Sequence, residues 1–158
     1  MTTLFSALDW RTMSQEARDL GLNNSVAVAG SLEMVTGWEQ RSGEMRKRFP
    51  DTIDLRYGPR ERNRIDFLKA ADGAPTLLFI HGGYWQRGDR REYAFVAREL
   101  VARGVNVALP SYTLCPETGI DGIAAEIEQF LVALWAKTKC RPVLVGHSAG
   151  GHLAAMLM

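Results

Sequence analysis

The feature that most constrains the fold is an alternation of short apolar stretches with amphipathic ones in the second half of the sequence. Residues 76–80 (Thr-Leu-Leu-Phe-Ile), 105–109 and 142–145 are almost wholly apolar, which is typical of strands buried on both faces of a parallel sheet. Helical patterns separate these strands, and parallel strands joined through helices require right-handed crossovers. The sequence therefore predicts an α/β fold, with helices on both faces of a mostly parallel sheet.

Two amphipathic helices are predicted between the strands. Asp89 and Glu92 form a capping box for the first, and Gly104 stands where that helix is expected to end. Its apolar stripe has helical spacing and consists of Tyr93, Val96, Ala97, Leu100 and Val101. Asp121 is expected to cap the second helix, whose stripe consists of Ile123, Ile127, Phe130, Leu131 and Leu134. A third helix is expected over 152–158.

The first part of the chain has a different texture. Helical patterns are predicted over 14–20 and 32–49, and strands over 52–57 and 64–69. Pro50 ends the second helical pattern. We therefore expect a helical extension or cap in residues 1–50 and the N-terminal part of a single α/β domain in residues 51–158. The sequence leaves open whether the extension covers the functional site or packs on the far side of the sheet.

The balance of charge disfavours some classes of partner. The chain has 158 residues, of which 19 are basic and 18 acidic, for a formal net charge of +1. Nothing in this balance favours nucleic acid or an anionic membrane as a partner, and the basic run over 41–48 is interpreted as a solvated helix face. The N-terminus lacks the pattern of a signal peptide, and no apolar stretch approaches the ~20 residues that span a bilayer. We expect a cytoplasmic protein and leave its oligomeric state open.

No residue pattern indicates a metal or a cofactor. Cys115 and Cys140 are too few for a disulfide framework and lack metal-ligand spacing. His147 and His152 are not part of a His-Glu-x-x-His motif and have no clustered carboxylates beside them. The glycines over 146–151 match neither a dinucleotide-binding fingerprint nor a phosphate-binding loop. We therefore expect chemistry carried by side chains and backbone alone.

The motif Gly146-His147-Ser148-Ala149-Gly150 carries the strongest indication of chemistry. It follows the apolar strand 142–145 and opens a helix, a setting in which a strained turn presents a serine hydroxyl above the sheet. Such a turn leaves room only for small residues two positions either side of the serine, which Gly146 and Gly150 provide. We therefore predict that Ser148 is a nucleophile. The alternative is a glycine-rich turn that packs closely and has no chemistry.

A second glycine-rich motif, His81-Gly82-Gly83-Tyr84-Trp85, follows strand 76–80. Acyl transfer builds negative charge on a carbonyl oxygen, and fixed backbone N–H groups stabilise that charge. A glycine-rich loop brings its amides close enough for this role, and the amide of Ala149 is expected to complete the set. Because both motifs end parallel strands, both loops are expected at the edge of the sheet where ligands bind. The alternative is a tight turn without such a role.

Together with Tyr112-Thr113-Leu114-Cys115-Pro116, these motifs resemble those of kynurenine formamidase (arylformamidase) and its carboxylesterase relatives. The three motifs stand in the family's order, and the resemblance runs from about Asn23 to the last residue. It implies the α/β-hydrolase fold, no cofactor, and hydrolysis either of N-formylkynurenine to kynurenine and formate or of a short-acyl carboxylic ester. The expected partner is a small-molecule amide or ester, because the resemblance fixes the reaction type better than the substrate.

The resemblance also implies roles for particular residues. Ser148 would be the nucleophile. The amides of Gly83, Tyr84 and Ala149 would form the oxyanion hole, and Gly82 would shape its loop. His81 is expected to brace that loop through hydrogen bonds. The aromatic rings of Tyr84 and Trp85 are candidates for stacking on an aromatic substrate or for packing in the core.

The rest of a catalytic triad is missing from these residues. A serine hydroxyl needs a base, normally a histidine held by a carboxylate, and in this fold the acid and the histidine follow the nucleophile. No Asp or Glu follows Ser148, and His152 lies on a rigid helix with no later acid to orient it. We therefore expect a hydrolase fold truncated after the nucleophile strand: a fragment, inactive alone, whose strand 142–145 is an exposed sheet edge.

A hypothesis from another class is a non-catalytic binding module that kept the pocket of a hydrolase. The missing acid and base favour this hypothesis. The intact motif around Ser148 argues against it, because a strained backbone has little use without chemistry.

Overall fold

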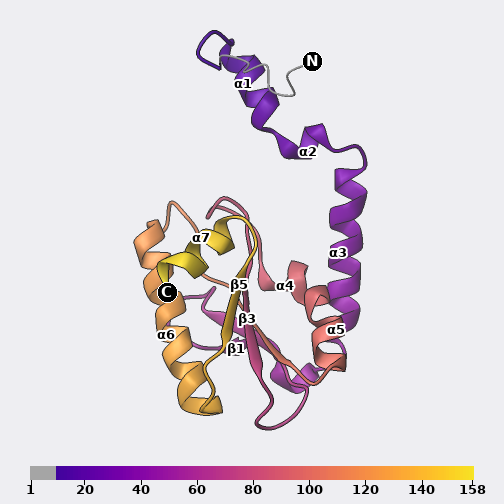
Figure 1. Ribbon diagram of the computed structural model, residues 1–158, viewed down its shortest axis with the longest axis vertical. Helices are drawn as coiled ribbons and strands as arrows, with labels where there is room; N and C mark the ends of the chain where they lie inside the picture. The colour runs from indigo at the N-terminus through magenta and orange to yellow at the C-terminus, as the bar shows by residue number, and fades with distance from the viewer. Residues whose placement is uncertain (1–9) are drawn as a thin grey trace, which may run out of the picture. The chain divides into compact units, whose positions relative to one another are not determined.

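The computed structural model describes residues 10–158 of the protein (Figure 1). This part of the chain divides into two compact units between Gly37 and Trp38. The first unit contains the helices α1 (Gln15–Leu22) and α2 (Asn24–Ala27) and the start of α3 (Ser31–Arg46). Ser14 caps α1 by accepting a hydrogen bond from the amide of Ala17 at 3.1 Å. The two helices predicted in this region are present, with slightly different ends.

The second unit is built on a five-stranded sheet with the strand order β1-β2-β4-β3-β5. The strands are β1 (Leu55–Arg56), β2 (Arg64–Leu68), β3 (Thr76–Ile80), β4 (Asn106–Pro110) and β5 (Val143–Gly146). β3 pairs in parallel with both β4 and β5, whereas β2 pairs antiparallel with β1 and β4. The three predicted apolar strands thus form the parallel part of a mixed sheet, and the β1–β2 hairpin adds its antiparallel edge.

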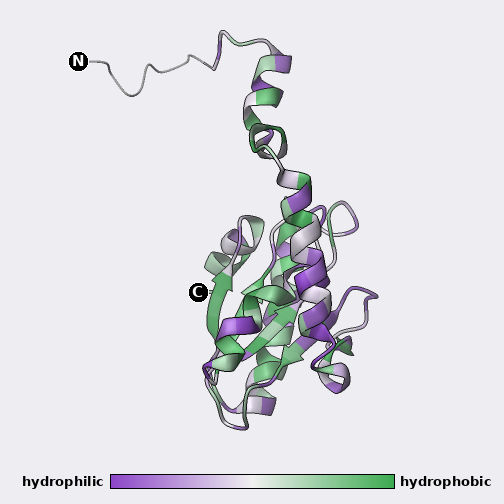
Figure 2. Ribbon diagram, turned by 90° about the vertical axis from the view of Figure 1, so that its right-hand side faces the viewer, coloured by the Kyte–Doolittle hydropathy of each residue, from purple (hydrophilic) through white to green (hydrophobic). Residues whose placement is uncertain are grey.

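Helices cover both faces of this sheet (Figure 1). On one face lie α6 (Ile120–Thr138) and α7 (Ala149–Met156), and on the other lie α4 (Arg90–Tyr93), η2 (Ala94–Val96) and α5 (Ala97–Ala102). A short helical turn, η1 (Pro50–Thr52), leads into the first strand. Figure 2 shows the strands mostly in hydrophobic colours between helices of mixed character. This is the layered α/β architecture that the alternation of patterns predicts.

The core consists of two apolar clusters, one on each face of the sheet. Along β3, Leu78 and Ile80 are fully buried in the cluster that α6 and α7 complete. Leu77 and Phe79 point the other way and pack on the cluster that contains Met45 of α3 and Ala97 of α5. Successive side chains of a strand alternate between faces, so the continuous apolar run of β3 supplies both clusters.

The helix predicted after Asp89 is interrupted by a side chain from α3. Asp89 caps α4 as predicted, and its carboxylate accepts from the amide of Arg91 at 3.1 Å. The hydroxyl of Ser42 then accepts from the amide of Phe95 at 3.0 Å and donates to the carbonyl of Glu92 at 2.9 Å. An inserted hydroxyl of this kind breaks the helical hydrogen-bond ladder. The single predicted helix is therefore the succession α4, η2 and α5.

The buried residues of α3 also set the start of the second unit. Ser42 and Met45 are buried against the α4–α5 layer and the sheet. Both residues belong to the second unit, which begins at Trp38, and the expected domain boundary at residue 51 stays a prediction. The role of residues 1–50 as an extension or a cap stays a prediction.

The predicted cap of the next helix is wrong by two residues. Gly119, not Asp121, is the N-cap of α6, and Asp121 lies in its first turn. A carboxylate in the first turn is still favourable, since the helix dipole is positive at that end.

A buried ion-pair cluster joins the helical layer to the sheet. The carboxylate of Asp66 in β2 is fully buried and accepts from Arg46 Nε at 2.6 Å and from Arg90 Nε at 3.0 Å. Asp54 completes the cluster by pairing with both arginines. Burial opposes the charge of Asp54, but the two guanidinium groups outweigh it and lower the pKa of this carboxyl. The cluster thus ties α3 and α4 to the β1–β2 hairpin.

The strand β5 forms one edge of the sheet. Leu144 packs into the core below α6 and α7, whereas Val143 and Val145 on its other face are 63% and 37% exposed. Along residues 10–158, no helix combines the length and the apolar character needed to cross a membrane.

Candidate active site

Ser148 lies on the sharp turn that joins β5 to α7. Its φ of 53° and ψ of −118° place it in a conformation that L residues rarely adopt, at a cost of roughly 1–3 kcal/mol. Its side chain is exposed, and its carbonyl accepts from the amides of Gly151 and His152 in the first turn of α7. The strand, turn and helix predicted around this serine are all present.

The two glycines beside Ser148 stand where a side chain does not fit. A Cβ at Gly146 would lie 2.1 Å from the carbonyl oxygen of Gly150. A Cβ at Gly150 would lie 2.0 Å from the carbonyl oxygen of Ile80, in the neighbouring strand. Glycine at these positions therefore lets α7 approach both β5 and β3 closely enough to form the turn.

The loop after β3 has an unusual backbone. Gly83, Tyr84 and Trp85 have φ angles of 120°, 54° and 57°, so three consecutive residues are left-handed. The carbonyl of Gly83 accepts from the amides of Gln86 and Arg87 at 3.0 and 2.9 Å, which closes the turn. Tyr84 is exposed, whereas Trp85 is partly buried and packs against the core.

The loop and the serine turn are in contact. Pairing of β3 with β5 brings Ile80 opposite Gly146, and the amide of His147 donates to the carbonyl of Ile80 at 3.1 Å. A Cβ at Gly82 would lie 2.7 Å from the carbonyl oxygen of His147 and 3.1 Å from Ser148 Cβ. The two motifs, more than sixty residues apart in the sequence, therefore meet where β3 and β5 end.

The amides of Gly83, Tyr84 and Ala149 donate no hydrogen bond in the part of the chain that the structure describes, and those of Gly82, Trp85 and Ser148 are unpaired as well. Unpaired N–H groups beside a serine hydroxyl provide the hydrogen-bond donors that an oxyanion requires.

None of the three histidines is hydrogen-bonded to Ser148 Oγ within residues 10–158. The ring of His81 is buried and stacks on Tyr112 with ring centroids 4.3 Å apart. His147 approaches Tyr93, and His152 makes an edge contact with Trp85 at 5.4 Å.

The buried environment of His81 makes its imidazole a weak base. Burial lowers the pKa of His81 to about 4, and a hydrogen bond between Nδ1 and the carbonyl of Gly82, 2.8 Å long, only partly opposes this effect. The imidazole is therefore neutral and tied to the loop.

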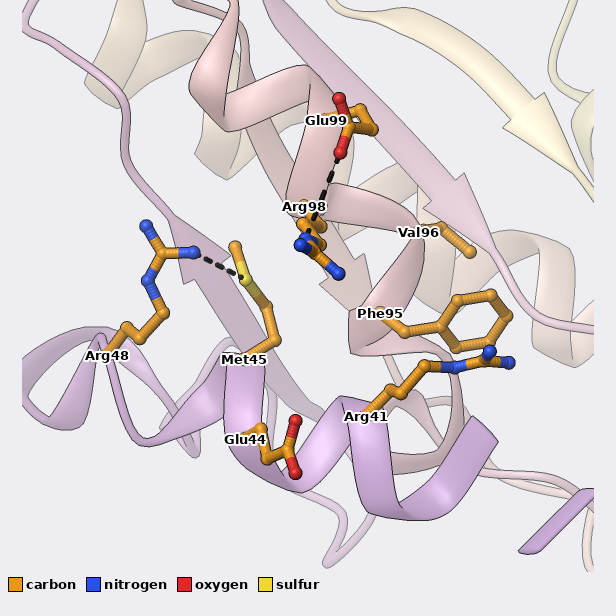
Figure 3. Close-up of a pocket in the computed structure, with 8 residues that line it drawn as sticks. All are labelled: Arg41, Glu44, Met45, Arg48, Phe95, Val96, Arg98 and Glu99. Atoms are coloured by element: carbon orange, nitrogen blue, oxygen red, sulfur yellow. Dashed lines mark hydrogen bonds and ion pairs between the residues drawn. The ribbon is translucent and has the colours of Figure 1, made fainter. Parts of the chain in front are cut away.

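A hollow of about 640 Å³ lies elsewhere in the unit, between α3 and α5 (Figure 3). Its lining is Arg41, Glu44, Met45, Arg48, Phe95, Val96, Arg98 and Glu99. None of these residues belongs to the two motifs, and none supplies a nucleophile. The candidate site is therefore the junction of the loop and the serine turn rather than this hollow.

The described residues offer no metal centre. Among residues 10–158, no three His, Cys, Asp or Glu side chains are grouped so that they could hold an ion. Cys115 and Cys140 are free thiols, both partly buried.

Two residues near the loop were not found from the sequence. Gly88 (φ +92°) packs on Gly82 and His81, and Arg62 donates to the carbonyls of Gly88 and Tyr112 at 2.6 and 2.8 Å. Gly88 follows the loop motif closely, which is a weak signal. Arg62 stands in the charged segment 60–64, whose composition is that of an ordinary solvent-exposed loop and gives no signal.

Known proteins share this architecture. The profile of the alpha/beta hydrolase family matches residues 77–158. A kynurenine formamidase of Drosophila melanogaster is 34% identical over 76% of this chain and 42% of its own length, and one of Danio rerio is 28% identical over 95% and 55%. The chain thus spans about half the length of the curated relatives it matches.

Solved structures agree with these sequence matches. A crystal structure of a candidate thioesterase from a Silicibacter species is 33% identical, with a TM-score of 0.78 over 85% of this chain and 52% of its own. Esterase B of Lactobacillus rhamnosis is 27% identical, with a TM-score of 0.59 over 80% and 48%. The serine turn, its strand neighbours and these matches lead to one conclusion: the chain belongs to the alpha/beta hydrolase family, as a member similar to kynurenine formamidases and carboxylesterases.

Proposed function

We propose that the protein is a serine hydrolase that cleaves an N-formyl aryl amide, of the N-formylkynurenine type, through an acyl-enzyme on Ser148. The observation that supports this most is the contact between Gly82 and the strained Ser148 turn, in two turns whose amides at Gly83, Tyr84 and Ala149 are unpaired within the described residues. The kynurenine formamidases among the relatives support the amide substrate.

The chemistry follows from what each group can do. Ser148 Oγ attacks the carbonyl carbon while a base takes its proton, and the carbonyl oxygen becomes an oxyanion. The amides of Gly83, Tyr84 and Ala149 donate to that oxygen, Gly82 keeps their loop against the serine turn, and Gly146 and Gly150 let the turn form. The amine then leaves with a proton, and water hydrolyses the acyl group from Ser148.

The base in this proposal is none of the three histidines described above. His81 is buried with its Nδ1 bonded to the Gly82 carbonyl, and the rings of His147 and His152 contact Tyr93 and Trp85. We therefore expect residues 1–158 to hydrolyse substrate only slowly, which turnover measured on either substrate would check.

A carboxylesterase of short acyl groups is the second candidate. It is supported by the relatives and structures that are esterases, such as esterase B of Lactobacillus rhamnosis. The two candidates differ in the leaving group, so kcat/KM for N-formylkynurenine and for 4-nitrophenyl acetate distinguishes them.

The first experiment replaces the nucleophile in the protein expressed from its complete gene. We expect Ser148→Ala to lower kcat by at least about 10³-fold on either substrate, because the covalent step is lost. A fluorophosphonate should label the unchanged protein at Ser148, as located by peptide mass spectrometry. Ser25→Ala, an exposed serine of α2, is the matched control and should retain full activity.

Two results would contradict the proposal. Turnover by Ser148→Ala equal to that of the control would remove this serine from the reaction. No turnover and no phosphonate labelling in the unchanged protein would favour a non-catalytic binding module.

A further inference from the structure

The Gly82–Gly83 peptide joins two features of the loop. Gly82 contacts the serine turn, and the amide of Gly83 is unpaired within the described residues. In a trans peptide the C=O and N–H groups share one plane and point in opposite directions. The carbonyl of Gly82 and the amide of Gly83 belong to the same peptide unit. A contact that fixes the carbonyl of Gly82 therefore fixes the direction of the Gly83 N–H as well.

The imidazole of His81 makes such a contact. Its Nδ1 lies 2.8 Å from the carbonyl oxygen of Gly82. That oxygen can only accept, so Nδ1 carries the proton. Nε2 is buried and has no partner in the described residues, which suits an unprotonated nitrogen and not a charged N–H. The neutral tautomer with hydrogen on Nδ1 is therefore the one that fits this geometry.

His81 itself is held on several sides. Its ring stacks on Tyr112 and on Tyr93, with interplanar angles of 10° and 14°. The hydroxyl of Tyr112 donates to the carbonyl of His81 at 2.8 Å. Arg62 bridges the carbonyls of Tyr112 and Gly88. One guanidinium group, that of Arg62, thus links Tyr112, which stacks on the His81 ring, to the backbone of Gly88.

Gly88 packs directly against the hydrogen bond between His81 and Gly82. A Cβ at Gly88 would lie 2.6 Å from the carbonyl oxygen of Gly82 and 2.9 Å from His81 Nδ1, which are the two ends of that bond. A methyl group here cannot be accommodated without separating them.

From this geometry we infer that Gly88 and the neutral His81 are positioning residues of the oxyanion hole, which act by orienting the Gly82–Gly83 peptide. This inference rests on the proposed function, since it assigns a cause to the direction of one proposed donor. A hydrogen bond accepted by a peptide carbonyl also polarises the N–H of the same peptide. His81 therefore strengthens the Gly83 donor besides aiming it.

The test uses Gly88→Ala in the protein expressed from its complete gene. We expect kcat to fall roughly tenfold to a hundredfold with KM nearly unchanged, because a misplaced donor weakens the transition state and not substrate binding. Gly73→Ala is the matched control: Gly73 is also left-handed, at φ +70°, but a Cβ there meets nothing within 4 Å. It imposes similar backbone strain and should retain the kcat of the unchanged protein.

A second pair of variants tests the hydrogen bond itself. His81→Asn keeps an N–H donor near the position of Nδ1 and should retain most of kcat, whereas His81→Leu should lower it about as far as Gly88→Ala. The ¹⁵N NMR signals of His81 at pH 7 should show a protonated Nδ1 and an unprotonated Nε2. This measurement needs only the unchanged protein, so it stands even where a variant fails to fold.

The outcomes separate this inference from the proposed function. If Ser148→Ala is inactive but Gly88→Ala has the kcat of Gly73→Ala, the positioning role is wrong and the serine mechanism stands. A His81 signal for the opposite tautomer, or for the imidazolium, would also overturn the positioning role. If Ser148→Ala retains activity, both proposals fail together.

Discussion

At the scale of single residues, the left-handed backbone of Gly83, Tyr84 and Trp85 determines the directions of the two aromatic side chains in this loop. The reversal sends the ring of Tyr84 outward, where it is 51% exposed with the Arg87 guanidinium 5.5 Å from its centre. It sends Trp85 inward, where the indole packs on the core. Trp85 thus packs with the core, whereas the exposed ring of Tyr84 is free to contact a substrate, and substrate stacking by either residue stays a prediction.

A substitution at Tyr84 distinguishes the role of its ring from that of its backbone amide. Tyr84→Ala keeps the N–H and should leave kcat for 4-nitrophenyl acetate within about twofold. We expect KM for N-formylkynurenine to rise roughly three- to tenfold, the effect of one lost aromatic contact. Steady-state kinetics on both substrates measure this, with Trp135→Ala, an exposed aromatic residue of α6, as the control. An equal rise of KM in the control would refute a contact between substrate and Tyr84.

Single residues also mark the limit of prediction from the sequence. Ser148 and its glycines could be found because a strained turn restricts residue types at fixed spacing. Gly88 and Arg62 could not, because their importance comes from contacts with His81, Gly82 and Tyr112 that appear only after the chain has folded.

At the scale of elements, the buried Asp66 cluster holds helices to the sheet. Asp66 has no exposed surface, and its two partners come from α3 and α4. Charges buried in this way are stable only while each keeps its partners. The attachment of α3 and α4 to the β1–β2 hairpin therefore depends on Asp66, the fully buried carboxylate of the cluster, and on Asp54, which pairs with the same two arginines.

Removing the charge of Asp66 should weaken the whole unit. We expect Asp66→Asn to lower the free energy of unfolding by about 3 kcal/mol, because Arg46 and Arg90 lose the fully buried one of their two shared carboxylates. Asp72→Asn is the control: Asp72 pairs with Lys69 on the surface with its side chain 95% exposed, and its loss should cost less than about 1 kcal/mol. Urea unfolding followed by circular dichroism measures both variants. Equal midpoints for the two would show that the cluster contributes little.

The positions of helices and strands could be predicted where a local sequence pattern alone determines them. The strands β3, β4 and β5 lie within one residue of their predicted positions, because apolar runs bounded by turn residues determine them. The predicted helix after Asp89 is wrong in its continuity, because the interruption comes from Ser42, fifty residues earlier in the chain. Strand 52–57 shortens to two residues in β1. Such long-range effects leave no local signal.

At the scale of the whole molecule, two buried groups link stability to pH. Burial raises the pKa of Asp89, but hydrogen bonds from Arg91, the charge of Arg90 and the hydroxyl of Ser111 outweigh it, and the pKa is about 2. Burial lowers the pKa of His81 to about 4. In both cases the unfolded chain binds a proton at a higher pH than the folded one, so acid favours unfolding.

The pH range of this effect differs between the two groups. The contribution of His81 is complete above pH 6.5 and is lost as the pH falls to about 4, a loss of roughly 3 kcal/mol. That of Asp89 is lost between about pH 3.8 and 2. Urea unfolding from pH 7 to 4 should show the first loss, and His81→Asn should flatten the curve in this range. The same slope in both proteins would contradict the assignment to His81.

The edge contact between Trp85 and His152 gives the site an optical reporter. The emission of an indole depends on the groups and the solvent in contact with its ring. His152 lies one helical turn beyond Ser148 on α7, so we expect a molecule bound over the serine to change the surroundings of this pair of rings. The emission of Trp85, one of four tryptophans in the chain, should then report binding without a coloured leaving group.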